Sequence, residues 1–101
     1  MEKNENEKIE VIEKHNQEKG ILLLYVNDVR AGEMTFVFAK EDKIIVDHTG
    51  INEEFEGRGY GKILVEKIVL FARENHIKII PLCPYAKRVI NSTEEYHDIL
   101  N

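Results

Sequence analysis

The sequence is most restrictive in what it lacks. Its 101 residues include a single cysteine, Cys83, two prolines and no tryptophan. No apolar run approaches the roughly 18 residues that a membrane-spanning helix needs. A lone cysteine excludes an internal disulfide and fits a reducing, cytoplasmic environment. With one cysteine and four scattered histidines, a structural zinc site is not expected.

Positive charge is also scarce. The 19 acidic residues outnumber 14 lysines and arginines, the formal net charge is -5, and no basic stripe with interleaved aromatic residues is present. This balance argues against a protein that binds nucleic acid. The N-terminus is charged and polar, without the apolar segment of a signal peptide. We expect residues 1–8 to form a disordered tail and residues 9–101 to form one domain.

What the sequence does contain is a regular series of strand and helix patterns. Apolar or alternating runs separated by short turn signals predict four strands in an antiparallel meander. A stripe of apolar residues at helical spacing follows, and then a run rich in β-branched residues that should pair in parallel with the fourth strand. The expected strands are 9–14, 21–26, 33–39, 44–51 and 77–82, and the expected helices are 62–75, 85–90 and a last turn through Leu100 that a capping-box pattern at 92–95 opens. This order predicts a mixed α+β fold, mostly antiparallel, that splays at one parallel strand pair.

The most informative segment, Glu56-Gly57-Arg58-Gly59-Tyr60-Gly61-Lys62, joins the fourth strand to the first helix. Alternating glycines leave backbone N–H groups uncovered, and a helix start carries partial positive charge, so the segment suits a pyrophosphate. It is not a Rossmann fingerprint, because Lys62 stands where the third glycine is needed, and it is not a Walker A loop, because Ile63 follows Lys62. The alternative is a tight turn that only packs the helix closely against the sheet.

The pattern x-x-x-Gly-x-Gly at residues 56–61 resembles the acyl-CoA pyrophosphate loop of the GNAT superfamily of N-acyltransferases. The flanks strengthen this likeness. Segment 44–51 contains His48-Thr49-Gly50, segment 78–85 contains Pro81-Leu82-Cys83-Pro84, and their order resembles a family of very small GNAT-like acetyltransferases. The likeness extends over residues 20–100. It implies a GNAT-like fold, acetyl-CoA as co-substrate and transfer of an acetyl group to an amine.

The resemblance also implies where acetyl-CoA lies. The pantetheine arm should pair with exposed backbone of the fourth strand, and the pyrophosphate should lie on the glycine loop. Glu56 departs from the superfamily, which usually has Gln or Arg there. Together with Glu53 and Glu54 it would repel phosphate unless these carboxylates point outward. The cofactor-binding residues expected on this basis are Val46, Asp47, Thr49, Gly50, Ile51, Gly57, Arg58, Gly59, Tyr60, Gly61 and Lys62.

His48 is the first candidate for a chemical role. It alternates with Ile44 and Val46 and is therefore expected on their face of the strand. One interpretation is a hydrogen-bonded core or rim residue. The other is a group that takes a proton from the acceptor amine, because only a neutral amine attacks a thioester and an imidazole of ordinary pKa is mostly unprotonated near neutral pH.

Cys83 and Tyr96 are the other candidates. Cys83 is either a small core hydrophobe or, as the resembled family implies, a site residue that carries the acetyl group covalently. Tyr96 resembles the tyrosine that protonates the departing CoA thiolate, with Tyr85 as its rival, and both are equally interpretable as packing residues. The thioester is expected between His48 and Cys83.

The acceptor site is expected to be open, because no helix interrupts the meander over residues 21–51. An open site suits a protein amine or a polyamine. The alternative function, from a different class, is a non-catalytic module that binds an acyl-CoA and acts through a partner protein. Such a module keeps the glycine loop and needs neither His48 nor Cys83.

Overall fold

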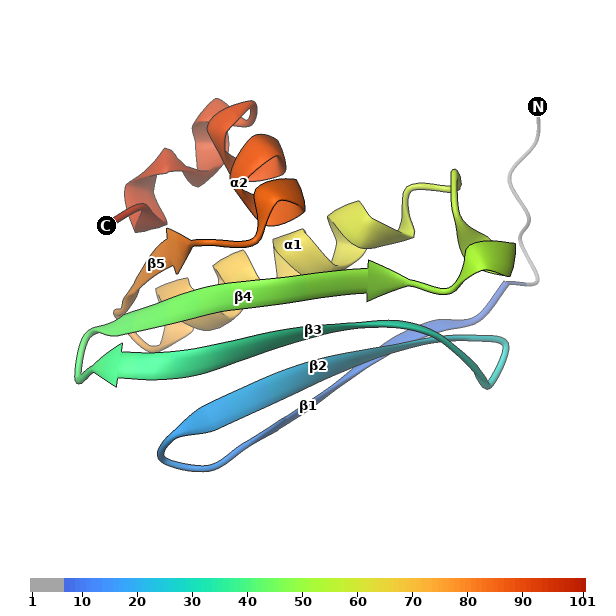
Figure 1. Cartoon of the computed structure of the whole chain (residues 1–101), viewed down its shortest axis with the longest axis horizontal. Coiled ribbons are helices and arrows are strands. Elements are labelled where there is room, and N and C mark those ends of the chain that lie inside the picture. The colour runs from blue at the N-terminus through green and yellow to red at the C-terminus, as the bar shows by residue number, and fades with distance from the viewer. Residues whose placement is uncertain (1–6) are drawn as a thin grey trace.

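The computed structural model describes residues 7–101 and contains one five-stranded sheet with its helices on one side (Figure 1). The strands are β1 (Ile9–His15), β2 (Lys19–Val26), β3 (Val29–Lys40), β4 (Lys43–Ile51) and β5 (Lys78–Pro81). The α-helices are α1 (Tyr60–Glu74) and α2 (Pro84–Asn91), and two 3₁₀ helices are η1 (Glu53–Phe55) and η2 (Glu94–Ile99). Strands β1 to β4 are antiparallel in sequence order, and β5 pairs in parallel with β4. The predicted meander and parallel pair are confirmed.

Some predicted boundaries were wrong for local reasons. Strand β3 begins at Val29, because Asn27 and Asp28 both have positive φ and form a two-residue hairpin turn. Helix α1 begins two residues early, because Gly59 takes the left-handed conformation and serves as the N-cap. The capping box at 92–95 is not formed. Instead, the Thr93 hydroxyl donates to the Val89 carbonyl at 2.7 Å, and η2 follows without a side-chain cap.

The predicted tail is only partly described. Residues 1–6 lie outside the described residues. Lys8 is hydrogen-bonded to Asn27, whose N–H donates to the Lys8 carbonyl at 2.7 Å and whose Oδ1 accepts from the Lys8 N–H at 2.8 Å. The structured part of the chain therefore includes Lys8.

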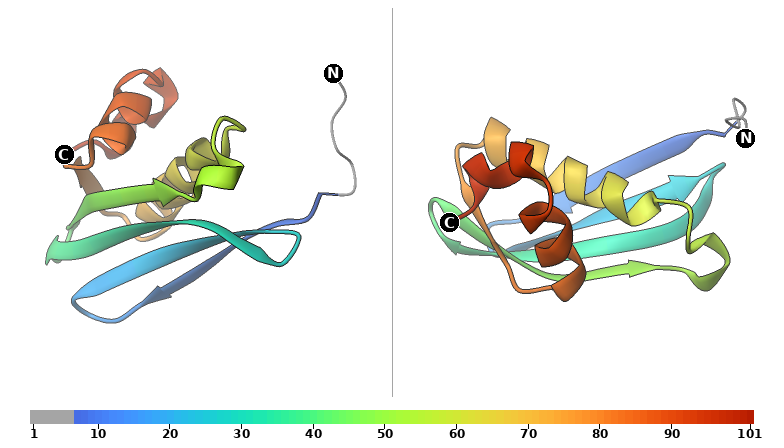
Figure 2. Two further views of the ribbon diagram at one scale, coloured as in Figure 1. Left: turned by 45° about the vertical axis from the view of Figure 1, so that its right-hand side comes forward. Right: turned by 90° about the horizontal axis from the view of Figure 1, so that it is seen from above.

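The core lies between α1 and the sheet, which Figure 2 shows from two further sides. Alternate side chains of β2 and β3 point to this layer, and the predicted apolar stripe of α1 covers them. Full burial of one such side chain stabilises the fold by about 1.5–3 kcal/mol. The buried set includes Leu22, Leu24, Met34, Phe36, Ile44, Val46, Leu64, Val65, Ile68, Phe71 and Ala72.

The opposite face of β1 to β3 carries no helix or strand of the described residues (Figures 1 and 2). Its apolar side chains are only half-buried, for example Ile21, Leu23 and Val37. One face of the sheet thus builds the core, and no helix or strand among residues 7–101 covers the other. No helix within residues 7–101 is both long and apolar enough to cross a membrane.

We expect Ile68→Ala to lower the free energy of unfolding by about 2–5 kcal/mol, because Ile68 is fully buried under the sheet. Leu70 lies on the same helix but is 39% exposed, so Leu70→Ala should cost less than about 1 kcal/mol. Urea denaturation of both variants checks this. Equal losses would contradict the assigned orientation of α1.

Candidate active site

The site begins where β4 and β5 separate. The Val46 carbonyl accepts two hydrogen bonds from the chain that leaves β5, one from the Leu82 N–H at 3.0 Å and one from the Cys83 N–H at 2.9 Å. The ladder of parallel pairs ends there, at Val46 opposite Pro81. On one side, residues 47–51 of β4 remain paired with β3. On the other side, no strand among residues 7–101 pairs with them. That free backbone edge can accept an extended ligand as an added strand.

A β-bulge lies at the same point. Phe36 pairs with Val46 and Thr35 pairs with His48, so Asp47 is the extra residue between two register positions. The prediction that His48 shares the face of Ile44 and Val46 was wrong, because the bulge reverses the alternation. His48 lies on the open face of the sheet, and Asp47 is tied there by the Thr35 hydroxyl, which donates to its Oδ1 at 2.6 Å.

His48 is paired with a carboxylate that sequence reasoning missed. Its Nε2 lies 2.9 Å from Oε2 of Glu33, and the His48 side chain is 55% exposed. The second carboxylate oxygen of Glu33 accepts from Arg30 at 3.5 Å. Gly50 makes room for this pair, because a Cβ there would lie 2.7 Å from Glu33 Oε2 and 3.0 Å from His48 Nε2. Only the register of β3 against β4 could have revealed Glu33, and the bulge hides that register in the sequence.

Cys83 lies on the helix side of β4, not beside His48. It is 5% exposed, precedes α2 as its N-cap, and its thiol donates to Thr49 Oγ1 at 3.4 Å. Thr49 follows His48 in sequence and points to the other face, where its partner Met34 is buried. His48 and Cys83 therefore lie on opposite sides of β4, and a thioester cannot lie directly between their side chains as expected.

The glycine loop has the geometry of an exposed backbone turn. Gly57 and Gly59 have φ of 80° and 83°, a left-handed conformation that favours glycine, and nothing lies within 4 Å of a Cβ built at either position. No side chain caps the start of α1, so N–H groups of its first turn are available to an anion. Gly61 has a different role, because a Cβ there would lie 2.6 Å from the Tyr85 hydroxyl.

These parts surround one pocket of about 380 Å³ at the end of β4 and the start of α1. Among the predicted cofactor residues, Val46, Asp47, Gly50, Arg58 and Lys62 are not in its lining. Phe55 and Tyr85 are in the lining although they were not predicted as cofactor residues. The residues lining the pocket are Thr49, Ile51, Phe55, Glu56, Gly57, Gly59, Tyr60, Gly61 and Tyr85.

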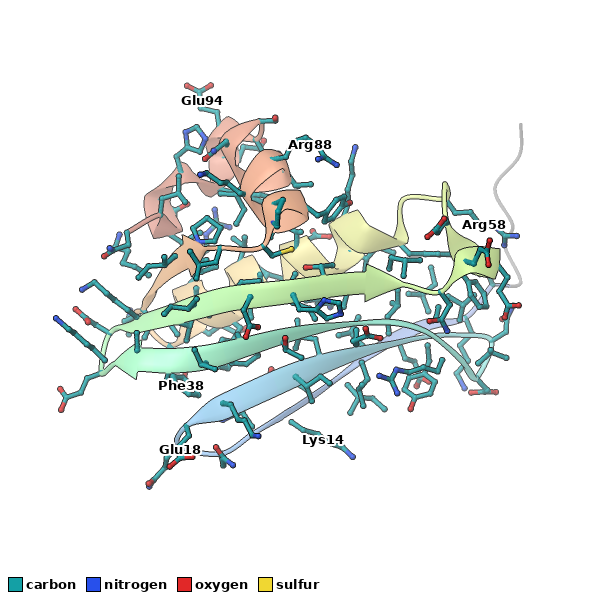
Figure 3. The ribbon with its side chains drawn as sticks, in the orientation of Figure 1. Lys14, Glu18, Phe38, Arg58, Arg88 and Glu94 are labelled. Carbon is teal, nitrogen blue, oxygen red and sulfur yellow. The ribbon has the colours of Figure 1, made fainter. Side chains whose placement is uncertain are left out.

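The charges around the pocket are mixed. Glu56 lines it, whereas Glu53 and Glu54 are exposed on η1 and are not in its lining. Arg58 lies over the Phe55 ring at 5.9 Å, and Arg88 lies over the Tyr85 ring at 5.4 Å. Figure 3 shows Arg88 on α2, well separated from Arg58 on the loop. Two guanidinium groups thus stand near the aromatic walls and can offset the Glu56 carboxylate.

Of the two candidate tyrosines, Tyr85 is at the pocket and Tyr96 is not. Tyr96 lies on η2, half-buried beside α1, where burial and then the carboxylates of Glu66 and Glu95 raise its pKa. Burial also raises the pKa of Tyr85, against an opposing effect of Arg88. The Tyr85 phenol therefore stays protonated at neutral pH and can donate a hydrogen bond into the pocket.

Tyr60 lines the pocket, and its ring is buried. The ring is 3% exposed and packs against Phe55, and its hydroxyl donates to the Glu7 carboxylate. That hydrogen bond, followed by burial, raises the pKa of Tyr60. Among residues 7–101, no group of three or more His, Cys, Asp or Glu side chains is arranged to hold a metal ion.

A family model described as GCN5-related N-acetyl-transferase matches residues 23–99. Because this match covers most of the chain, the protein belongs to the GCN5-related N-acetyltransferase family. A GCN5-like protein from Staphylococcus aureus, solved by NMR, is 32% identical over 89% of this chain and 87% of that chain, with a TM-score of 0.66. The predicted family resemblance and the predicted fold class are confirmed.

Two further solved structures share the fold. An acetyltransferase from Bacillus subtilis in complex with CoA is 15% identical, with 74% of this chain and 64% of that chain covered and a TM-score of 0.61. A GNAT family acetyltransferase from Elizabethkingia anophelis with acetyl-CoA bound is 17% identical, with 63% and 42% covered and a TM-score of 0.60. Among curated proteins, no significant match to the sequence was found.

The burial of Cys83 predicts slow thiol labelling. We expect a disulfide reagent to modify the native protein at least about tenfold more slowly than the protein in denaturant, because access requires local opening. The control is Ser92→Cys in a Cys83→Ala background, since position 92 is exposed at the end of α2 and should label fast in the folded state. Equal rates for native and denatured Cys83 would contradict the assigned burial.

Proposed function

We propose that this protein transfers an acetyl group from acetyl-CoA to a primary amine. The observation that carries the proposal is one continuous surface: the free edge of β4 from Asp47, the pocket, and the uncapped start of α1 behind Gly57 and Gly59. An extended thioester followed by a pyrophosphate has the shape of that surface. Family membership and the relatives solved with CoA or acetyl-CoA support it.

Binding divides between two stretches of backbone. The pantetheine arm would add to β4 along residues 47–51, where amide groups have no strand partner on that side. The pyrophosphate would accept hydrogen bonds from the N–H groups of residues 57–62. Gly57 and Gly59 leave this backbone without side chains that could block the ligand. Arg58, Lys62 and Arg88 would add positive charge at the surface of this stretch.

The Glu33–His48 pair would accept the proton of the amine. A carboxylate can only accept a hydrogen bond, so Nε2 of a neutral His48 carries the hydrogen that Glu33 receives, and the lone pair is on Nδ1. Because β4 is an edge strand here, an amine on the open face can reach a thioester held at that edge. A bond forms between the amine nitrogen and the acyl carbon, the carbon–sulfur bond breaks, and the amine proton passes to Nδ1 directly or through water.

Tyr85, and not Tyr96, would contact the bound CoA. Its protonated hydroxyl lies at Gly61 in the pocket and can donate a hydrogen bond to the pyrophosphate end of the ligand, and the departing thiolate takes up a proton from water. In the proposed reaction, Cys83 would be a core residue and not a nucleophile, because its thiol is buried and donates a hydrogen bond to Thr49. We therefore favour direct transfer over an acetyl-cysteine intermediate.

The alternative of a non-catalytic acyl-CoA module is less well supported. Such a module needs the loop and the free edge but has no use for a carboxylate-paired histidine beside that edge. Gly50 keeps the space that this pair occupies, and the family is one of enzymes.

A substitution at Gly59 tests the phosphate site. Gly59→Asp should weaken CoA binding at least about tenfold, because it places a carboxylate where the phosphate would accept hydrogen bonds, an interaction of about 1.5–3 kcal/mol. Gly59→Asn is the control, since asparagine has nearly the same shape, tolerates positive φ and carries no charge. Titration calorimetry with CoA measures both. If both variants bind like the parent, the phosphate site is not at this loop.

Removal of the proposed base tests the chemistry. His48→Ala should lower kcat about a hundredfold with CoA affinity unchanged, because general-base catalysis contributes about 10²–10⁴ in rate. Added imidazole should restore part of the loss, which a purely structural defect would not allow. His97→Ala is the control, because His97 lies on η2 and contacts the Asn91 carbonyl. Full activity of His48→Ala would eliminate His48 as the base.

A further inference from the structure

The open face of the sheet carries a row of cross-strand neighbours that begins at the proposed base. His48 on β4 pairs with Thr35 on β3, Thr35 pairs with Ile21 on β2, and Ile21 pairs with Lys14 on β1. Residues paired in this way share one face of the sheet. Three strand spacings of about 4.8 Å separate the two ends, or about 14 Å between their Cα atoms. The row leads from a proton acceptor, across apolar and hydroxyl groups, to a cation.

A depression of about 510 Å³ follows this row from Thr35 to Lys14, and at the β4 end it is lined by Asp47, the neighbour of His48, and not by His48 itself. It is the larger of the two pockets described here, and it lies on the face opposite the CoA pocket. Its floor is partly apolar, whereas its two ends are charged. The side chains of the open face that line it are Lys14, Lys19, Ile21, Thr35, Val37 and Asp47.

The charged groups of the depression are separated by sign. Asp47 is next to His48, and its side chain accepts a hydrogen bond from the Thr35 hydroxyl. Lys14 and Lys19 stand at the other end, and among residues 7–101 neither these lysines nor Asp47 forms an ion pair. Figure 3 shows Lys14 extending from β1 on the side away from the helices, with Glu18 directed elsewhere. A ligand in the depression therefore meets an anion at one end and two cations at the other.

We propose that this depression is the acceptor site and that the acceptor is an amine with an anionic group at its far end. This inference rests on the proposed acetyl transfer and names the substrate class for it. The ammonium group is drawn to Asp47, next to His48, and an apolar segment lies over Ile21 and Val37. The anionic group faces Lys14 and Lys19, and it takes no part in the reaction. A polyamine would instead bring its second cation against the lysines.

Three acceptors of equal length separate these possibilities: 6-aminohexanoate, hexylamine and 1,6-diaminohexane. With acetyl-CoA saturating, release of free CoA gives kcat/KM for each. We expect 6-aminohexanoate to exceed 1,6-diaminohexane at least about fivefold, which is the size of one or two exposed ion pairs gained and a like-charge contact avoided. A preference for the diamine, or equal rates for all three, would overturn the proposal.

Charge reversal at the far end should reverse the preference. Lys14→Glu combined with Lys19→Glu should favour 1,6-diaminohexane over 6-aminohexanoate, mainly through KM. The control, Lys40→Glu with Lys67→Glu, changes the net charge equally at exposed positions outside the depression and should keep the original order. An identical shift in both double variants would mean that net charge, and not this site, selects the acceptor.

Direct binding separates failure of this inference from failure of the proposed function. Addition of 6-aminohexanoate without acetyl-CoA should shift amide NMR signals of Lys14, Ile21, Val37 and Asp47, and the shifts should be lost in the Lys14→Glu, Lys19→Glu variant. If CoA binds and amines are acetylated but these signals do not move, the acceptor lies elsewhere and the acetyltransferase function stands. If these signals move but no amine is acetylated, the binding site stands and the proposed reaction fails.

Discussion

The site depends on a single carbonyl oxygen. Val46 receives the N–H groups of both Leu82 and Cys83, so the chain leaving β5 closes on this oxygen instead of continuing along β4. Pro84 then begins α2 with its fixed φ, so the chain turns into a helix directly after Cys83. The sheet therefore ends its parallel pairing after four residues and leaves an unpaired strand edge in the middle of the molecule.

The bulge beside that edge determines which side chains of β4 lie on each face of the sheet. Without it, strict alternation would turn Asp47 and His48 to opposite sides, with His48 in the core under α1. With the extra residue, both polar side chains reach the open face, and Thr49 returns to the helix side to meet Cys83. In the function proposed above, the nucleotide would approach this edge along the helical face and the amine along the open face. One sheet would then provide both binding surfaces without extra helices.

The sequence predicted those features of the fold that depend on local residue patterns. The stripe of α1 and the meander follow from spacing of apolar residues, and the glycine loop follows from composition at a strand–helix junction. The side of His48 was mispredicted because a bulge is set by pairing with β3, which lies far away in sequence. The sequence also could not show which tyrosine lies at the pocket, because only the packing of α2 on α1 places the Tyr85 phenol at Gly61. The roles of the loop and catalytic residues stay predictions.

Gly50 has a consequence for how relatives of this protein diverge. A Cβ at this position would lie 2.7 Å from Glu33 Oε2 and 3.0 Å from His48 Nε2, so a side chain there would displace the ends of this pair, although the backbone conformation of Gly50 is ordinary. Positions 33, 48 and 50 are therefore constrained together: a lineage that exchanges the acid or the imidazole for a small residue frees position 50 to accept a side chain. If this contact constrains the family, the three positions should change together, and a relative with a side chain at position 50 should lack the acid or the imidazole.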